Sequence, residues 1–245
     1  TGSMYKTFSN CDNLTSVFLA GVETDIRPGV YARECFAFSS SIETLTVNNF
    51  HLDTSSQGSN VAFRFCYRTG TSTTNGCEYN LNNWSAVQPT NSPLSIHQIF
   101  SSCRIKSINA NNWDLSAISN GTINMSYFIA SSAWPTANKT AYFKNWNWHP
   151  NSQVRMDYFY NGSFIEEVDF SGNDERINLC YAYQMAYLSR LQRIKGLNKF
   201  KMCPTVFLTG AQRIFRRAQY MTFSPTDPSY NFSDDFLTGS NADSL

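Results

Sequence analysis

The sequence lacks the features that most often identify a function directly. No run of 18 apolar residues occurs in the 245-residue chain, so we expect no membrane-spanning helix. Charged residues make up only 15% of the chain, whereas 42% of residues are hydrophobic. Disordered chains have the opposite balance, so these fractions predict a folded chain.

Sequence motifs of the common catalytic classes are also missing. The chain has no G-x-x-x-x-G-K-[ST], G-x-G-x-x-G, H-E-x-x-H or G-x-S-x-G. Its cysteines form no C-x-x-C pair, and His51, His97 and His149 are far apart, so no zinc ligand set is apparent. We therefore expect no catalytic residue, no cofactor, no metal and no nucleic-acid partner.

The seven cysteines are an odd number, so at least one thiol is free unless chains are cross-linked. Cys66 and Cys77 flank a loop rich in Gly, Thr, Ser and Asn, and only this pair indicates a local bridge. Cys180 has no histidine nearby, and its basic neighbour Arg176 stands beside two acidic residues. We interpret Cys180 as a core thiol rather than a nucleophile.

A recurring pattern of apolar residues runs through most of the chain. Its skeleton is apolar-x-x-apolar-x-apolar-x-x-(aromatic or Asn), repeated about every 30 residues. The middle apolar residues of the copies are Val17, Leu45, Tyr79, Ile108, Ala141, Val168 and Ile194. Alternation of apolar residues predicts a short strand with one buried face in each copy.

The segments before these strands carry apolar residues three or four positions apart, as in Ile96, Ile99 and Phe100. This spacing predicts one or two turns of helix. A unit of strand and short helix cannot bury its own apolar face, so we expect the copies to stack with their strands parallel and side by side.

The copies at 8–19, 36–52 and 100–115 follow most closely, each in part, the pattern F-x-x-C followed by L-x-x-L-x-L-x-N-[FW]-D. This pattern resembles the BspA-like class of leucine-rich repeats, although Ser39 replaces the repeat cysteine that Cys11 and Cys103 match. The resemblance implies an α/β solenoid of about seven irregular repeats, with a parallel sheet on the concave face and short helices on the convex face. It also implies attachment or protein binding without catalytic residues, as in bacterial surface proteins.

The pattern divides the chain into four parts. We interpret 1–3 as a cloning remnant, 4–200 as the solenoid, 201–225 as a degenerate capping repeat and 226–245 as a polar tail. The stretch from Cys180 to Arg217 has a more helical pattern, as expected of an atypical terminal repeat. No long apolar run follows Met4, so we expect no secretory signal in this sequence.

Basic residues gather between positions 190 and 217, where no acidic residue occurs. They are Arg190, Arg193, Lys195, Lys199, Lys201, Arg213, Arg216 and Arg217. Such a segment is expected to attract an anionic partner or to contact a neighbouring subunit. The alternative is a solvated basic face that complements the acidic remainder of the chain.

An aromatic residue recurs at the turn after the strand. It lies three residues beyond the last apolar residue of the strand, so we expect its ring to turn inward and stack on the ring of the next copy. The predicted stacking residues are Phe50, Trp84, Trp113 and Trp146. The alternative is an exposed aromatic row that binds sugar.

The solvent face of the predicted strands is rich in Asn and poor in charge. Its predicted ligand-binding residues are Thr46, Asn48, Asn80, Asn82, Asn109, Asn111, Tyr142, Lys144 and Asp169. Such a face suits an uncharged partner, a glycan or a protein loop; alternatively, the Asn side chains only stabilise the stack as ladders. In the first copy the same alternation puts Phe18 and Ala20 outward, which counts against the pattern unless a cap covers them.

We therefore expect a non-enzymatic binding or adhesion module, located on a bacterial cell surface, secreted, or carried on a phage particle. The rival is a receptor-binding domain of a viral envelope glycoprotein with a β-sandwich fold. It rests on the N-x-S/T sites at Asn13, Asn83, Asn120, Asn124, Asn138, Asn161 and Asn231. The third candidate is a carbohydrate-active enzyme using Glu167 and Asp169, although a solvated strand face explains these two residues more simply.

Overall fold

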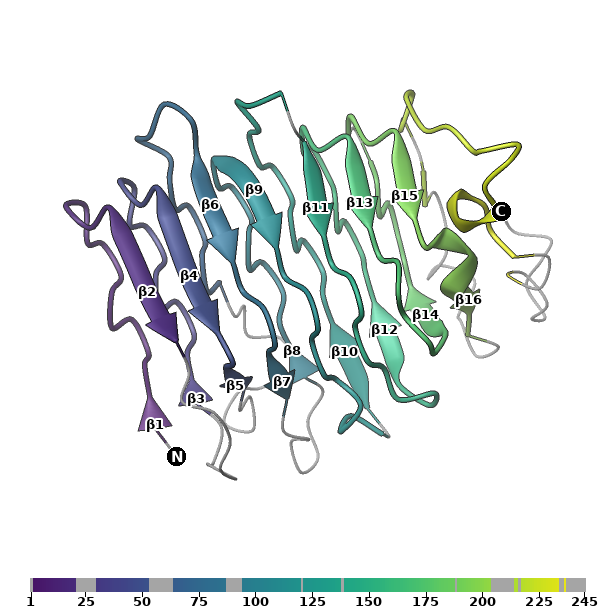
Figure 1. The fold of residues 1–245 in the computed structure, drawn as a ribbon, viewed down its shortest axis with the longest axis horizontal. Coiled ribbons are helices and arrows are strands. Elements are labelled where there is room, and N and C mark those ends of the chain that lie inside the picture. Colours follow the sequence, from purple (N-terminus) through teal and green to yellow (C-terminus); the bar gives the residue numbers. More distant parts are fainter. Residues whose placement is uncertain are drawn as a thin grey trace.

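The computed structural model describes residues 2–20, 30–52, 64–86, 94–119, 121–137, 139–187, 189–203, 214–215, 217–233 and 236. Over these residues the chain winds into a β-solenoid, in which short strands from successive turns lie side by side (Figure 1). All the strand pairs are parallel. The β-sandwich of the rival hypothesis is therefore wrong, because it requires antiparallel strands.

The strands form three sheets. The longest has seven strands in the order β2 (Ser16–Ala20), β4 (Thr44–Asn48), β6 (Cys77–Asn80), β9 (Ile105–Asn109), β11 (Thr140–Tyr142), β13 (Glu167–Asp169) and β15 (Arg193–Lys195). A five-stranded sheet contains β8 (Leu94–Ser95), β10 (Thr122–Asn124), β12 (Gln153–Arg155), β14 (Ile177–Tyr181) and β16 (Phe200–Met202). The smallest sheet joins β1 (Gly2–Ser3), β3 (Val30–Tyr31), β5 (His51–Leu52) and β7 (Ser85–Ala86).

The register of the seven-stranded sheet follows the alignment of the sequence copies. The middle apolar residues pair through their Cα positions from one strand to the next: Val17, Leu45, Tyr79, Ile108, Ala141, Val168 and Ile194. All seven side chains are buried. Alternation of period 2 was therefore enough to predict which residues meet across the stack.

The segments predicted as short helices are instead columns of turns. Each holds two left-handed residues four positions apart, such as Gln98 (φ +61°) and Ser102 (φ +59°). Some N–H groups bond to the next coil, as in Phe100 N–H to the Phe128 carbonyl at 2.8 Å, and others close turns within the segment, as in Ser101 N–H to the Gln98 carbonyl at 3.4 Å. The described residues contain no α-helix and only two 3-10 helices, η1 (Leu197–Lys199) and η2 (Pro228–Tyr230). The α/β leucine-rich-repeat class with helices is therefore wrong for this chain.

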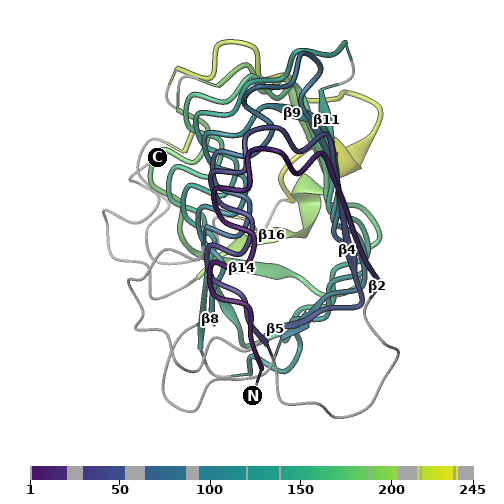
Figure 2. The same ribbon diagram turned by 90° about the vertical axis from the view of Figure 1, so that its left-hand side faces the viewer.

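The number of repeats also differs from the prediction. The seven-stranded sheet takes one strand from each sequence copy, but the second sheet has only five strands. The stack amounts to about five turns rather than about seven repeats. Figure 2 looks along the stack, with the seven-stranded sheet as one wall and the turn columns and five-stranded sheet as the other.

Aromatic rings fill the space between the walls. The rings of Trp84, Trp113 and Trp146 are stacked, with centroids 4.9 and 4.6 Å apart, and Phe50 lies 5.2 Å from Trp84 at a tilt. The Trp84 indole N–H donates to the Val47 carbonyl of the preceding coil at 2.6 Å. Such an acceptor avoids the free-energy cost of burying an unpaired indole N–H.

The two ends of the stack differ. At the C-terminal end, Thr222 N–H bonds to the Gln192 carbonyl and Gly196 N–H to the Ser229 carbonyl, both at 2.8 Å, beside β15. Phe232 and Phe236 stack over this end with centroids 3.9 Å apart. At the N-terminal end, the Phe18 side chain on β2 is 73% exposed, and no described residue covers it.

Candidate binding surface

The outer face of the seven-stranded sheet carries the predicted ligand-binding residues. Eight of the nine are half-buried, and the ninth, Asp169, is buried at 4% exposure. Together with Phe18, the Cα partner of Thr46, they lie in two rows that run across the strands. We call them the Thr46 row (Phe18, Thr46, Asn80, Asn109, Tyr142, Asp169) and the Asn82 row (Asn48, Asn82, Asn111, Lys144).

In the Asn82 row, each amide oxygen is used by the next coil. Asn48 Oδ1 accepts from Asn82 N–H, Asn82 Oδ1 from Asn111 N–H, and Asn111 Oδ1 from Lys144 N–H, each at 2.9 Å. Within the described part of the chain, the Nδ2 groups of Asn48, Asn82 and Asn111 have no acceptor. The row therefore holds its amides in place through oxygen and leaves three pairs of N–H donors for solvent or a ligand.

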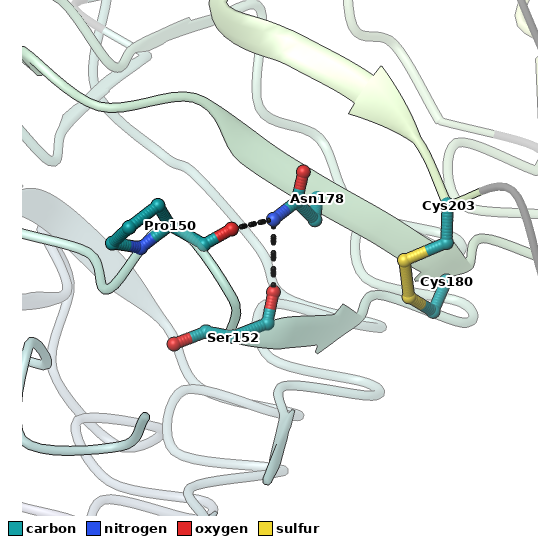
Figure 3. The surroundings of a disulfide bond; sticks show 5 residues. All are labelled: Pro150, Ser152, Asn178, Cys180 and Cys203. Atoms are coloured by element: carbon teal, nitrogen blue, oxygen red, sulfur yellow. Dashed lines mark hydrogen bonds between the residues drawn. A yellow bond between two sulfur atoms is a disulfide. The ribbon is translucent and has the colours of Figure 1, made fainter. Parts of the chain in front are cut away.

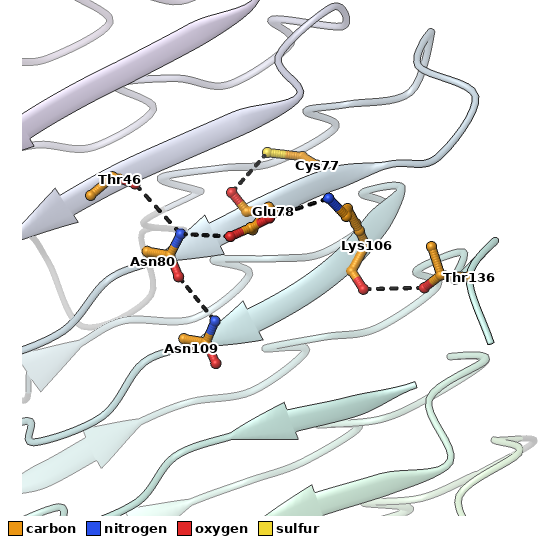
Figure 4. Close-up of polar contacts among 7 residues, drawn as sticks. All are labelled: Thr46, Cys77, Glu78, Asn80, Lys106, Asn109 and Thr136. Carbon is orange, nitrogen blue, oxygen red and sulfur yellow. Dashed lines mark hydrogen bonds and ion pairs between the residues drawn. The ribbon is translucent and has the colours of Figure 1, made fainter. Parts of the chain in front are cut away.

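The Thr46 row is linked side chain to side chain, as Figure 4 shows. Asn109 Nδ2 donates to Asn80 Oδ1 at 2.9 Å, and Asn80 Nδ2 donates to Glu78 Oε1 at 3.2 Å and to Thr46 Oγ1 at 3.5 Å. Glu78 in turn pairs with Lys106 at 3.3 Å. The floor of the surface is thus polar, fixed and without an unpaired charge over β4, β6 and β9.

A third row, at the turn after the strands, is a closed amide ladder. Asn83 Nδ2 donates to Asn49 Oδ1, Asn112 to Asn83 and Asn145 to Asn112, at 2.9 to 3.0 Å. All four residues have φ between 56° and 59°, a left-handed conformation that Asn tolerates well. The ladder stops at Gly172, where a Cβ would collide with Asn145 Oδ1.

These ladders concern two alternatives that the sequence left open: a purely structural role for the Asn side chains, and a glycoprotein with sugar attached to Asn. Asn side chains do hold the stack together, so a structural role is present whatever the surface binds. Asn83, one of the acceptor sites on which the glycoprotein hypothesis rests, uses both its Nδ2 and its Oδ1 within the ladder. Asn120 and Asn138 lie outside the described residues.

The carboxylates considered for glycosidase chemistry are both ion-paired. Glu167 pairs with Arg193 at 2.6 Å, and Asp169 pairs with Lys144 at 3.2 Å. Asp169 Oδ1 also accepts from Ser171 N–H at 2.8 Å. Both carboxylates therefore bind neighbouring residues of the same sheet. This end of the face forms a charged border beside the neutral, Asn-rich part.

Those basic residues of 190–217 that the structure describes are spread over more than one face. Arg193 and Lys195 lie on β15, Lys201 lies on β16 in the other sheet, and Arg190 stacks 4.8 Å from the Phe164 ring centroid. Arg213 and Arg216 lie outside the described residues. Because a solenoid winds through every face within one turn, contiguous sequence does not become a contiguous surface.

The predicted bridge between Cys66 and Cys77 is wrong. Both are free and buried, while Cys180 and Cys203 form a disulfide between β14 and the end of β16, with Cα atoms 4.9 Å apart (Figure 3). Close to it, Asn178 Nδ2 donates to the carbonyls of Pro150 and Ser152 at 2.5 and 3.3 Å. The interpretation of Cys180 as a core thiol is therefore also wrong. Sequence spacing does not reveal this pair, because Cys180 and Cys203 become neighbours only when one coil stacks on the next.

The free thiols in the core are not reactive groups. Burial raises the pKa of the Cys35 thiol to about 12 and raises the pKa of the Cys66 and Cys77 thiols well above the ordinary value. A thiol with a raised pKa is a poor nucleophile at neutral pH. We therefore assign these cysteines to packing.

One buried histidine stands apart from the surface. His97 is 9% exposed, and its Nδ1 lies 2.7 Å from Ser95 Oγ. Burial, with smaller contributions from Arg64, Arg155 and Arg33, lowers the His97 pKa to about 4. The ring is therefore neutral at pH 7.

The described residues include no group of three or more His, Cys, Asp or Glu placed to hold a metal ion. No helix among them is long and apolar enough to cross a membrane. The chain matches no family model, no curated protein and no solved structure. The resemblance to BspA-like repeats therefore finds no support in these comparisons.

Proposed function

We propose that this protein is a non-enzymatic recognition module whose ligand, a glycan or a protein loop, binds the outer face of the seven-stranded sheet. The observation that carries the proposal is the Asn82 row, in which three amides are fixed through oxygen and keep unused N–H donors. Donors held in place by the fold lose little freedom on binding, which favours recognition. Attachment to a cell or virion surface would be a natural use of such a module.

The charge distribution supports an uncharged partner. The central part of the face has only the paired Glu78 and Lys106, and the further ion pairs Lys144–Asp169 and Arg193–Glu167 lie toward its C-terminal end. An anionic or cationic ligand would need unpaired charges of the opposite sign on this face. Hydrogen-bond donors without net charge suit hydroxyl and carbonyl acceptors instead.

The test is a screen of neutral glycans and peptides against the wild-type chain and the Asn82→Asp variant. Aspartate keeps an oxygen for Asn111 N–H but removes the donors, so binding should fall at least about tenfold without loss of folding, since one or two lost donors are worth roughly 1.4 kcal/mol. Asn151→Asp is the matched control, because Asn151 is exposed in the turn before β12 on the other wall.

The screen also separates binding from catalysis. Each glycan that binds is recovered and weighed by mass spectrometry, and we expect it intact. The proposal is overturned if no glycan or peptide binds, if Asn82→Asp binds as tightly as the wild type, or if bound glycans are cleaved.

A further inference from the structure

We infer that the sheet face is a track for a linear, uncharged glycan, and that Phe18 is the aromatic residue on which its terminal sugar stacks. The inference rests on the proposed function and names its ligand. The track is the part of the Thr46 row from Phe18 to Tyr142, with the Asn82 row beside it. It crosses β2, β4, β6, β9 and β11 in turn.

Phe18 is the most exposed large hydrophobic residue among those described, at 73%. The register places it directly beside Thr46, which is followed by Asn80, Asn109 and Tyr142. An aromatic ring therefore stands at each end of a row of three hydroxyl and amide side chains. A scattered exposed ring needs no explanation, but a ring aligned with a polar row is the arrangement of an apolar platform beside hydrogen-bonding groups.

Tyr142 differs from Phe18 in being held by its surroundings. It is half-buried, and the Lys144 ammonium lies 5.0 Å from its ring centroid while pairing with Asp169 at 3.2 Å. Beyond Tyr142 the row continues into the charged border at Asp169. Tyr142 therefore marks the end of the neutral track rather than its most accessible platform.

The spacing of the track selects between ligand classes. Adjacent strands lie about 4.8 Å apart, so the donors of the Asn82 row repeat at about that distance along the stack. Each sugar unit of an extended, equatorially linked glycan has nearly this length. Successive units turn over, but each carries hydroxyls on both edges, so every sugar can place a hydroxyl opposite a donor. An extended peptide presents carbonyls on one side only every 6.8 Å or so, which does not match.

The track has a definite length. Four strand spacings separate Phe18 from Tyr142, about 19 Å, which accommodates about four sugar units. Ligands shorter than this cannot reach both ends. Affinity should therefore rise with chain length up to about four units and then level off.

The groups needed for sugar binding are present on this face without a charged group among them. The apolar face of a pyranose ring stacks on an aromatic ring, while its hydroxyls accept from amide N–H groups. Phe18 supplies the first, and Asn48, Asn82 and Asn111 supply the second. In the sequence, an outward Phe18 counted against the repeat pattern. In the track, the same exposure is what makes its ring available to a sugar.

The experiment measures the affinity of β-1,4-linked glucose and N-acetylglucosamine oligomers of two to six units by calorimetry. We expect the length dependence above, and about a tenfold loss of affinity in Phe18→Ala, since one ring contact is worth up to roughly 1.4 kcal/mol. Phe18→Trp should restore binding. Phe164→Ala is the matched control, because Phe164 is also exposed, at 44%, but precedes β13 and is not in the row.

Thermal unfolding of each variant shows whether the fold is intact, and an exposed Phe18 should be replaceable without a change in midpoint. If a ligand binds and Asn82→Asp weakens it, but Phe18→Ala and chain length have no effect, the glycan track is overturned and the proposed function stands. If no oligomer or peptide binds the face at all, both are overturned.

Discussion

Trp113 and Trp146 lie with their rings parallel at an interplanar angle of 2°, their centroids 4.6 Å apart, although 33 residues separate them in sequence. Each is fully buried, and each indole N–H donates to a carbonyl of the preceding coil, Leu81 for Trp113 and Ala110 for Trp146. The column thus joins coils by ring contact and by hydrogen bond at once.

The two contributions of Trp113 can be separated by substitution. Trp113→Phe keeps a ring but loses the bond to Leu81, and should lower the free energy of unfolding by about 1–2 kcal/mol. Trp113→Ala removes both and should cost about 3–5 kcal/mol. Chemical denaturation measures both values, and equal losses in the two variants would contradict the role assigned to the ring.

The two kinds of Asn row predict different changes in stability when an Asn is replaced by Asp. Asn112 donates to Asn83 Oδ1, so Asn112→Asp places two acceptors face to face and should destabilise the fold by about 1–3 kcal/mol. Asn82→Asp keeps its single acceptor role and should change stability by less than about 0.5 kcal/mol. Denaturation curves of the two variants test this, and a larger loss in Asn82→Asp would refute the assigned ladder geometry.

The strand register could be predicted from the sequence, but the helices could not. Leu45, Tyr79 and Ile108 alternate with polar residues, and a one-residue slip would expose all of them, so the pattern has one solution. Ile96, Ile99 and Phe100 also fit two structures, a helix and a pair of turns. The turn structure depends on left-handed Gln98 and Ser102, which are not glycines and carry no sequence signal.

The candidate site was predictable in position but not in chemistry. Alternation assigns Asn80 and Asn82 equally to the outer face, yet the former is linked through side chains and the latter through backbone N–H groups. The distinction depends on where each strand ends relative to its neighbour, which residue type does not encode. The same limit applies to Cys180 and Cys203, whose proximity arises only from coil stacking.

The disulfide should act as a clamp on the last coil. It closes a loop with a sequence separation of 23 residues, for which chain entropy predicts a stabilisation of roughly 2–4 kcal/mol. Reduction of the disulfide, or the double variant Cys180→Ser with Cys203→Ser, should lower the free energy of unfolding by this amount, as measured by chemical denaturation. The buried thiols Cys35 and Cys66 should resist alkylation in the folded chain; their labelling before Cys180 in reduced protein would contradict this assignment.

His97 makes stability depend on pH in a defined direction. Its pKa is about 4 in the folded chain and near 6.5 when unfolded, so the unfolded state binds the extra proton. Its contribution to stability is complete above about pH 6.5 and is lost as the pH falls toward 4, by up to about 3 kcal/mol. His97→Gln should flatten the stability profile between these values, and an unchanged slope would show that His97 is not the group responsible.

The stacking register is tested most directly by cysteine cross-linking across the outer face. Thr46 and Asn80 are Cα partners on adjacent strands, so Thr46→Cys with Asn80→Cys should form a disulfide on mild oxidation, as Cys180 and Cys203 do at 4.9 Å. Thr46→Cys with Asn109→Cys spans two strand spacings, about 9.6 Å, and should not cross-link. A bridge in the adjacent pair alone is the predicted result. No bridge in that pair, or equal yields in both, would contradict the solenoid register and the binding face built on it.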